Sequence, residues 1–398
     1  MIKTGISLPA WHRSVITMFA LLGPAGMALM VRLPEIKELL GVSTSELGVL
    51  LFCGAIGSIS ALLIAARVIA RLGTKPQMLG GFYLVALGLT GQAFAATIHS
   101  PLLFAIVIFI TGFGYGITDV PLNVDGAAIE AKRGRSILPR LHAAYSVGAL
   151  SGAALGTVFI ALNVNLLVQM IILCSMQLVL PWVVGKYVPA HTGQDAYHRD
   201  VTAEKPEKIN LFKDKLIMFL GIGILCITLA EGAAVDWLAL TIVKDYAETA
   251  TNAGVAFAIF NLAMTVTRFF CGNISDRYGR RLTVQVMAIT GAIGLLLVIF
   301  GTSVIFAWIG AALWGIGSAL GFPLFISEAG EGENSARRVT LITTFGYMAF
   351  LVGPPTLGFV AEFTGLKTML FLVTVALLLA VFFSQIMSNN KTAKPLAK

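Results

Sequence analysis

The sequence has few charged residues and no recognisable catalytic or cofactor motif. Asp, Glu, Lys and Arg make up 12% of its 398 residues, whereas a soluble domain carries roughly 25%. It contains no nucleophile elbow, no phosphate-binding glycine-rich loop with its Lys-Ser/Thr, and no paired histidines for a metal. These absences argue against a soluble enzyme, an ATPase, and a metal or cofactor site.

Cysteine is also scarce. Cys53, Cys174, Cys226 and Cys271 fall inside apolar stretches without metal-ligand spacing, so we expect them to be small packing residues. We also expect no cleavable signal peptide, because the first apolar run is long enough to span a membrane and has no small-residue cleavage site.

What the sequence has in abundance is hydrophobic residues, at 57%. A membrane span needs about 20 mostly apolar residues, and backbone polar groups in lipid must be paired internally, which favours helices. The sequence therefore predicts an all-α membrane protein with twelve transmembrane helices. The expected spans are 14–33, 45–69, 77–97, 101–129, 137–162, 165–187, 214–243, 252–272, 282–301, 304–327, 338–361 and 366–387.

The net charge of +8 is unevenly distributed between these spans. With the N-terminus in the cytoplasm, all but four of the 28 Lys and Arg residues fall in cytoplasmic segments; the exceptions are Arg32, Lys37, Lys244 and Lys367. This is the positive-inside pattern, so both termini are expected in the cytoplasm. The basic surplus therefore indicates topology and not a nucleic-acid partner.

The two halves of the chain repeat each other. Tyr145 and Tyr347, Gly156 and Gly358, and Pro121 and Pro323 are each 202 residues apart. A parallel repeat of this length indicates duplication. We expect a six-helix bundle at 1–187, a cytoplasmic linker at 188–213, a second bundle at 214–387 and a cytoplasmic tail at 388–398.

A loop motif lies between two apolar stretches in the second half, and a partial copy of it occurs in the first half. Residues 272–281 contain Gly272, Asp276, Arg277, Gly279, Arg280 and Arg281, and this string resembles the cytoplasmic loop signature of the major facilitator superfamily. Residues 66–75 are a degraded copy with Ala70 in place of the acid. By analogy with the family, Asp276 is expected to meet the start of the fifth span near Ser136 as a cytoplasmic gate.

Acids inside predicted spans are candidates for function, because charge is costly in a membrane. Asp119 and Asn123 are four residues apart and share one helix face. We interpret Asp119 as a proton-coupling residue and Asn123 as a cavity residue; the alternative is a hydrogen bond that fixes helix packing. Glu231 is the second proton-coupling candidate. Asp236, followed by Trp237, either lines the cavity or faces external water.

Further cavity candidates lie near mid-span. His142 and Tyr145 are three residues apart, and His142 is either a proton relay or a neutral hydrogen-bonding partner. Aromatic and amide side chains suit a polar organic substrate, with helix packing or lipid contact as the alternative for each. These candidates are Asn261, Trp314, Phe345 and Tyr347. Gly148, Gly152 and Gly156 form a ridge that lets a neighbouring helix approach.

Longer strings are similar to a subgroup of the same superfamily. The segments Glu231–Trp237, Leu320–Leu324 and Gly346–Pro355 resemble the bacterial MosC/YbjJ-like subgroup, and Asp119-Val-Pro-Leu-Asn123 resembles a motif of its fucose-permease-like branch. In that branch the helix 4 acid is implicated in proton coupling. The first span departs from the branch, since it has no acid between Ser14 and Val31.

The resemblance implies a monomeric secondary transporter of the bacterial inner membrane, working by alternating access without a cofactor. The subgroup's association with an inositol-derived compound favours a sugar- or polyol-like solute moved with protons. Two alternatives stay open: a drug, amphiphile or lipid exporter, and a membrane sensor that binds a ligand without moving it.

Overall fold

A computed structural model describes residues 6–134, 137–194, 214–270, 274–330 and 335–388, and these residues form helices without strands. Twelve helical segments among them are long and apolar enough to cross a membrane. The predicted fold class is thereby confirmed.

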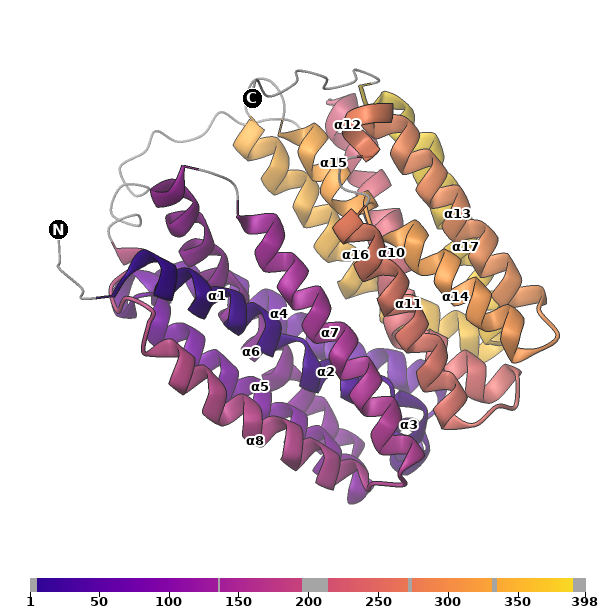
Figure 1. The fold of residues 1–398 in the computed structure, drawn as a ribbon. Coiled ribbons are helices and arrows are strands. Elements are labelled where there is room, and N and C mark those ends of the chain that lie inside the picture. The colour runs from indigo at the N-terminus through magenta and orange to yellow at the C-terminus, as the bar shows by residue number, and fades with distance from the viewer. Residues whose placement is uncertain (1–5, 135–136, 195–213, 271–273, 331–334, 389–398) are drawn as a thin grey trace. The chain divides into compact units, whose positions relative to one another are not determined.

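The chain divides into two compact units, Met1–Val42 with Val49–Pro206 (unit 1), and Ser43–Gly48 with Glu207–Lys398 (unit 2). Figure 1 shows the helices of the first half from indigo to magenta and those of the second from salmon to yellow. The first half contains α1 (Leu8–Leu22), α2 (Pro24–Met30), α3 (Leu33–Leu40), α4 (Thr44–Leu72), α5 (Thr74–Thr97), α6 (Pro101–Arg133), α7 (Leu138–Ala161) and α8 (Leu166–Gly185).

The second half begins after the predicted linker, most of which lies outside the described residues. It contains α10 (Lys215–Asp245), α11 (Ala250–Phe270), α12 (Ile274–Tyr278), α13 (Arg280–Phe300), α14 (Val304–Ser318), α15 (Gly321–Ala329), α16 (Ser335–Thr364), α17 (Leu366–Phe383) and the short 3₁₀ helix η1 (Ser384–Ile386).

Two predicted spans differ from single straight helices. The first begins at Leu8, earlier than predicted, because Ser7 caps the helix by accepting a hydrogen bond from the Ala10 N–H, and it breaks before Pro24. The tenth breaks between α14 and α15, at Ala319 and Leu320. Proline at the start of a helix leaves no N–H unpaired, whereas inside a helix it removes a bond, so a break before Pro24 costs little.

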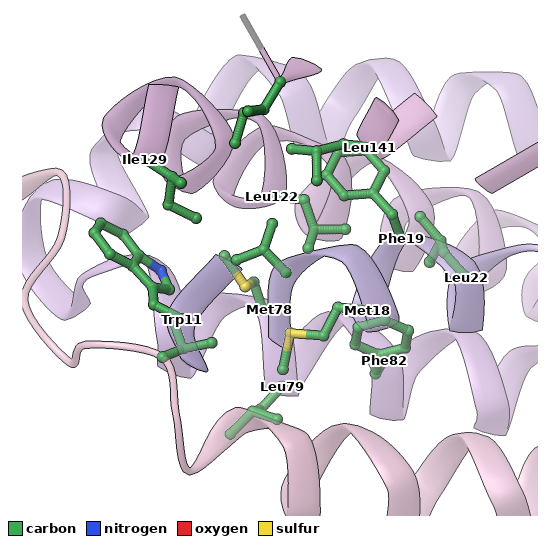
Figure 2. Packing of buried hydrophobic residues seen from close by; sticks show 13 residues of the cluster. Trp11, Met18, Phe19, Leu22, Met78, Leu79, Phe82, Leu122, Ile129 and Leu141 are labelled. Carbon is green, nitrogen blue, oxygen red and sulfur yellow. The ribbon is translucent and has the colours of Figure 1, made fainter. Parts of the chain in front are cut away.

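The core of unit 1 is an apolar cluster contributed by α1, α5, α6 and α7. Figure 2 shows Met18 and Phe19 of α1 packed with Met78 and Phe82 of α5 and Leu122 of α6. Each of these side chains is at most 2% exposed. The cluster therefore holds α6, with Asp119 and Asn123, against its neighbours.

Glycines set the spacing between α7 and the first two helices. A Cβ at Gly148 would overlap the carbonyl of Ala20, and one at Gly152 would overlap that of Pro24. A Cβ at Gly156 would lie 2.9 Å from Cα of Ala28. The ridge predicted from the sequence is therefore the surface on which α1 and α2 pack.

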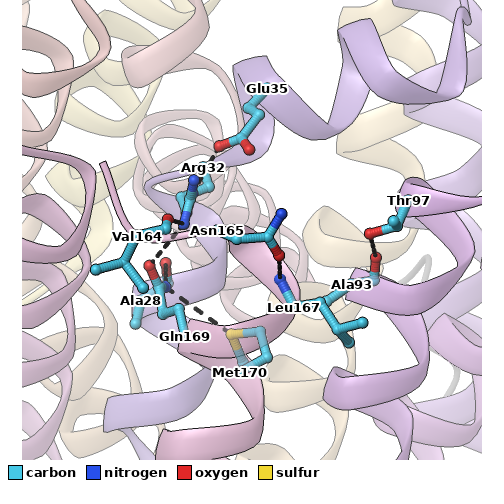
Figure 3. A network of polar contacts seen from close by, with 10 residues as sticks. All are labelled: Ala28, Arg32, Glu35, Ala93, Thr97, Val164, Asn165, Leu167, Gln169 and Met170. Atoms are coloured by element: carbon cyan, nitrogen blue, oxygen red, sulfur yellow. Dashed lines mark hydrogen bonds and ion pairs between the residues drawn. The ribbon is translucent and has the colours of Figure 1, made fainter. Parts of the chain in front are cut away.

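A polar network fastens the turn after α2. Arg32 is only 6% exposed; its Nε donates to Glu35 Oε2 at 2.6 Å, and its Nη1 donates to the Val164 carbonyl at 2.8 Å and to Gln169 Oε1 at 3.1 Å. Gln169 Nε2 in turn donates to the Ala28 carbonyl at 3.0 Å (Figure 3). The network ties α2 and α3 to the start of α8.

Candidate functional site

Asp119 and Asn123 are in contact on α6. Asn123 Nδ2 donates to Asp119 Oδ1 at 3.1 Å and to the Asp119 carbonyl at 2.9 Å. Pro121 lies between them and cannot donate to the carbonyl of Ile117, and Gln77 Nε2 of α5 donates to that carbonyl instead, at 3.0 Å. The backbone under the pair is thus satisfied without a break in α6.

His142 and Tyr145 of α7 lie on the neighbouring helix. The His142 ring packs edge-on against Phe19 at 5.4 Å between centroids, and His142 is near enough to interact electrostatically with the Asp119 carboxyl. Tyr145 packs against the apolar cluster of unit 1. The structure therefore brings Asp119, Asn123 and His142 together within one unit, while their roles remain predictions.

Glu231 has a partner that sequence reasoning missed. Arg268 Nη2 of α11 donates to both carboxylate oxygens of Glu231, at 3.0 and 3.1 Å. Arg268 Nε donates to the carbonyl of Ala319, at the break between α14 and α15, at 3.0 Å. An arginine inside the predicted span 252–272 is a signal for a buried ion pair. The sequence did not identify Glu231 as its partner, because the two residues are 37 positions apart on different helices.

Asp236 lies on a different side of α10. It lines a small pocket formed by α10 and α16, together with Gly232, Phe350 and Gly353. Residues five apart are about 140° apart around a straight helix, which agrees with this placement. Trp237 is fully buried, and its indole N–H has no partner among the described residues.

The remaining cavity candidates of unit 2 differ in accessibility. Trp314 is fully buried and donates through Nε1 to the Ala230 carbonyl at 3.1 Å. Asn261 is 2% exposed and donates to the Phe257 carbonyl at 2.9 Å. Phe345 packs against Gly221, and Tyr347 is 39% exposed. Trp314 and Asn261 thus occupy packing positions in this structure, and substrate contact by any of the four stays a prediction.

The described part of the loop motif comprises α12, Gly279 and the start of α13. Gly279 has a φ of +86°, a conformation that favours glycine, and Gly73 in the first-half copy has +83°. Arg280 Nη1 pairs with Glu328 Oε2 at 3.1 Å, Arg277 lies 5.4 Å from the Tyr278 ring, and Arg281 is half-buried. Gly272, the Asp276 side chain and Ser136 lie outside the described residues, so the predicted gate contact stays a prediction.

The first-half copy has a different contact at the equivalent place. Thr74 Oγ1 donates to the fully buried carboxyl of Asp125, at 3.2 Å to one oxygen and 3.3 Å to the other. Where the second half uses an arginine, the first half therefore uses a hydroxyl.

The cysteines and other possible metal ligands are dispersed over the described part of the chain. No group of three His, Cys, Asp or Glu residues there could hold a metal ion. Cys53, Cys174 and Cys226 are free thiols, and Cys271 lies outside the described residues.

Comparisons with known proteins match almost the whole chain. The family model described as Major Facilitator Superfamily matches residues 3–137 and 220–397. An uncharacterized MFS-type transporter of Yersinia pestis is 27% identical over 90% of both chains. The membrane protein MosC of Rhizobium meliloti is 28% identical over 89% of this chain and 85% of its own.

Solved structures share the fold at low sequence identity. The nucleoside transporter NupG superposes with a TM-score of 0.70 at 16% identity, covering 94% of this chain and 98% of its own. FucP, a Major Facilitator Superfamily transporter in the outward conformation, gives 0.64 at 17% identity, covering 95% and 98%.

Proposed function

Because the chain belongs to the Major Facilitator Superfamily, and is thus a multi-pass secondary transporter of small molecules and not an enzyme, we propose that it moves a sugar- or polyol-like solute together with protons. It does so as a monomer in the lipid bilayer of the bacterial inner membrane, with both termini cytoplasmic, by alternating access. The cytoplasmic loop motif 272–281 acts as the gate.

The observation that carries proton coupling is the contact between Asp119 and Asn123 beside His142. A charged carboxylate inside a membrane bundle is costly in free energy. Proton binding removes the charge, so a transporter can use this carboxyl to couple proton movement to solute movement. Asn123 holds the carboxyl through its amide N–H groups while its carbonyl oxygen can meet the solute. Protonation of Asp119 and solute binding are therefore linked through one side chain.

The competing acid is in a less suitable state. Glu231 is engaged in an ion pair, because Arg268 Nη2 lies 3.0 Å from its Oε1. Asp119 has an amide as its hydrogen-bonding side chain. This contrast favours Asp119 as the coupling residue, with Glu231 second.

The substrate class is supported by chemistry and by similar folds. Amide, imidazole and phenol groups on α6 and α7 suit hydroxyl-rich solutes. The fold is shared by NupG, named as a nucleoside transporter, and by FucP, named as a fucose:proton symporter. Both of those solutes carry sugar hydroxyls.

Flux into proteoliposomes tests this proposal. Purified protein is reconstituted and offered a panel of labelled sugars, polyols and nucleosides, with and without a pH gradient that is alkaline inside. We expect accumulation of one class that collapses when a protonophore removes the gradient. Flux of apolar drugs but no panel member would favour an exporter, and binding without flux would favour a sensor; either result contradicts the proposal.

A further inference from the structure

The ion pair between Glu231 and Arg268 is partly exposed. The Arg268 side chain is 26% exposed and that of Glu231 is 19% exposed. Charged groups in membrane helices face the bundle interior or a water-filled cavity, because contact with lipid is costly. A solute that enters such a cavity in unit 2 can therefore reach the pair.

Arg268 is held in place on two sides and has unused donors on a third. Of its five N–H groups, Nε donates to the Ala319 carbonyl and Nη2 donates to Glu231. Nη1 carries two more N–H groups and has no partner among the described residues. The two N–H groups of Nη1 can donate charge-assisted hydrogen bonds to a second carboxylate.

Two buried hydroxyls lie close in sequence to the partners of Arg268, one on α10 and one at the end of α14. Thr228 precedes Glu231 by three residues on α10 and is 1% exposed; Ser318 directly precedes Ala319 and is fully buried. In the described part of the chain neither Oγ has a hydrogen-bond partner. A buried hydroxyl without a partner costs free energy, so these positions have hydrogen-bonding capacity left for a polar solute.

The surroundings hold few other ionisable groups. On α10 itself there are Cys226 and Asp236, the latter in the pocket toward α16, and at the two helix ends Lys215, Lys244 and Asp245. No residue of α14 is ionisable, and Tyr347 is the titratable residue in the middle of α16. The charged residues of α15, α16 and α17 lie toward helix ends: Glu328, Arg337, Arg338, Glu362 and Lys367. Arg268 is therefore the charged group in contact with Glu231 among the described residues.

We propose that Arg268 binds the carboxylate of an acidic solute and that Glu231 takes up a proton as it does so. This inference rests on the proposed function and narrows its sugar- or polyol-like solute to one that carries an acid group. Two carboxylates on one guanidinium leave one negative charge uncompensated inside the bundle, which is costly. One proton from water, bound by Glu231 for each solute bound, removes that charge; no covalent bond forms or breaks.

Binding to the purified full-length protein in detergent tests the inference without any gradient. The probes are two matched pairs, D-gluconate with D-sorbitol and D-glucuronate with D-glucose, titrated at pH 6 and pH 8 by calorimetry. We expect each acid to bind at least about tenfold more tightly than its neutral partner, the size of effect that a charge-assisted hydrogen bond gives. Acid binding should tighten at pH 6, because the complex holds one more proton.

Two variants should shift binding in opposite directions. Glu231→Gln mimics the protonated acid, so it should bind both acids at least as tightly as the wild type and equally at the two pH values. Arg268→Gln should lose the preference for acids. The double variant, with a neutral amide at both positions, should also lose the preference for acids. It replaces Arg268→Gln in the test if that single variant does not fold. If the ion pair only supports the fold, both single variants should bind the acids more weakly than the wild type, and to the same extent.

Glu35→Gln is the matched control. It removes the acid of another ion pair while Arg32 keeps its bonds to Val164 and Gln169, so acid preference should be unchanged. Equal binding of acids and neutral partners, no binding of either acid, or a preference that survives Arg268→Gln would overturn the inference. In those cases gradient-driven uptake of neutral solutes through Asp119 would be unaffected. Failure of the proposed function would instead remove gradient-driven uptake of every solute.

Discussion

At the scale of single residues, three acids on membrane-spanning helices have three different kinds of partner. Asp119 contacts an amide, Asp125 contacts a hydroxyl, and Glu231 contacts a guanidinium. The cost of holding a negative charge in the bundle differs accordingly, because an arginine supplies a full opposite charge whereas an amide or hydroxyl supplies only dipoles. The three acids therefore differ in the chemistry of their hydrogen-bonding partners.

Asp119→Asn should abolish solute accumulation driven by a pH gradient while preserving solute binding and counterflow exchange. Asparagine keeps the shape of the neutral acid and can still bond to Asn123, but it cannot release a proton. The measurement compares gradient-driven uptake with counterflow in proteoliposomes, using a neutral solute. Glu231→Gln is the comparison variant. If Asp119→Asn still concentrates the solute with wild-type pH dependence while Glu231→Gln does not, the coupling proton belongs to Glu231.

At the scale of helices, α7 packs on α1 and α2 through glycines. Two glycine-to-alanine substitutions, one at this contact and one away from it, test whether the close packing matters for stability. Gly152→Ala should destabilise the protein by about 1–3 kcal/mol, since the added methyl would overlap the Pro24 carbonyl. Gly80→Ala in α5 should stabilise it by about 0.5–1 kcal/mol, because a Cβ there meets nothing within 4 Å and alanine favours a helix. Thermal unfolding in detergent measures both, and equal effects would show that close packing at Gly152 is not required.

The sequence predicts helices well here and contacts poorly. Long apolar runs bounded by turn residues locate the spans, and the spacing of Asp119 and Asn123 predicts their contact, because both depend on local geometry. The partner of Glu231 is 37 residues away on another helix, so no local period specifies it. The break before Pro24 has a local cause in the proline, whereas the break after Ser318 lacks this signal, because α15 begins with Gly321.

The loop between α11 and α13 gives a prediction for the gate. Asp276→Asn should shift the protein toward inward-open states and reduce flux without reducing its expression. A carboxylate at a helix start is stabilised by unpaired backbone N–H groups, and the amide loses that charge. Distances between spin labels on the two units report the conformational distribution, and flux is measured beside it. An unchanged distribution together with unchanged flux would contradict the gate role.

At the scale of the whole molecule, the duplicated halves keep one contact and change its chemistry. Thr74 with Asp125 in the first half corresponds to Arg280 with Glu328 in the second, and the two members are displaced by 206 and 203 residues. In both halves, a glycine of positive φ is followed by a residue that begins a helix and contacts an acid farther along the chain. Thr74 begins α5 and contacts Asp125 on α6, and Arg280 begins α13 and contacts Glu328 on α15. The repeat in the sequence is therefore also a repeat of contacts, with the ion pair confined to the second half.

The asymmetry of Lys and Arg predicts which ends of the helices face the cytoplasm. Single cysteines at Glu38 and Thr368, both exposed, should react with a membrane-impermeant maleimide on intact cells. Glu38 lies beside Lys37 in a predicted external segment, and Thr368 lies beside Lys367 at the predicted external end of the last span. A cysteine at the exposed Lys186 should react only after permeabilisation. The background is a variant whose four native cysteines are replaced by serine or alanine. Labelling at Glu38 and Thr368 only after permeabilisation, with Lys186 reactive on intact cells, would reverse the predicted topology.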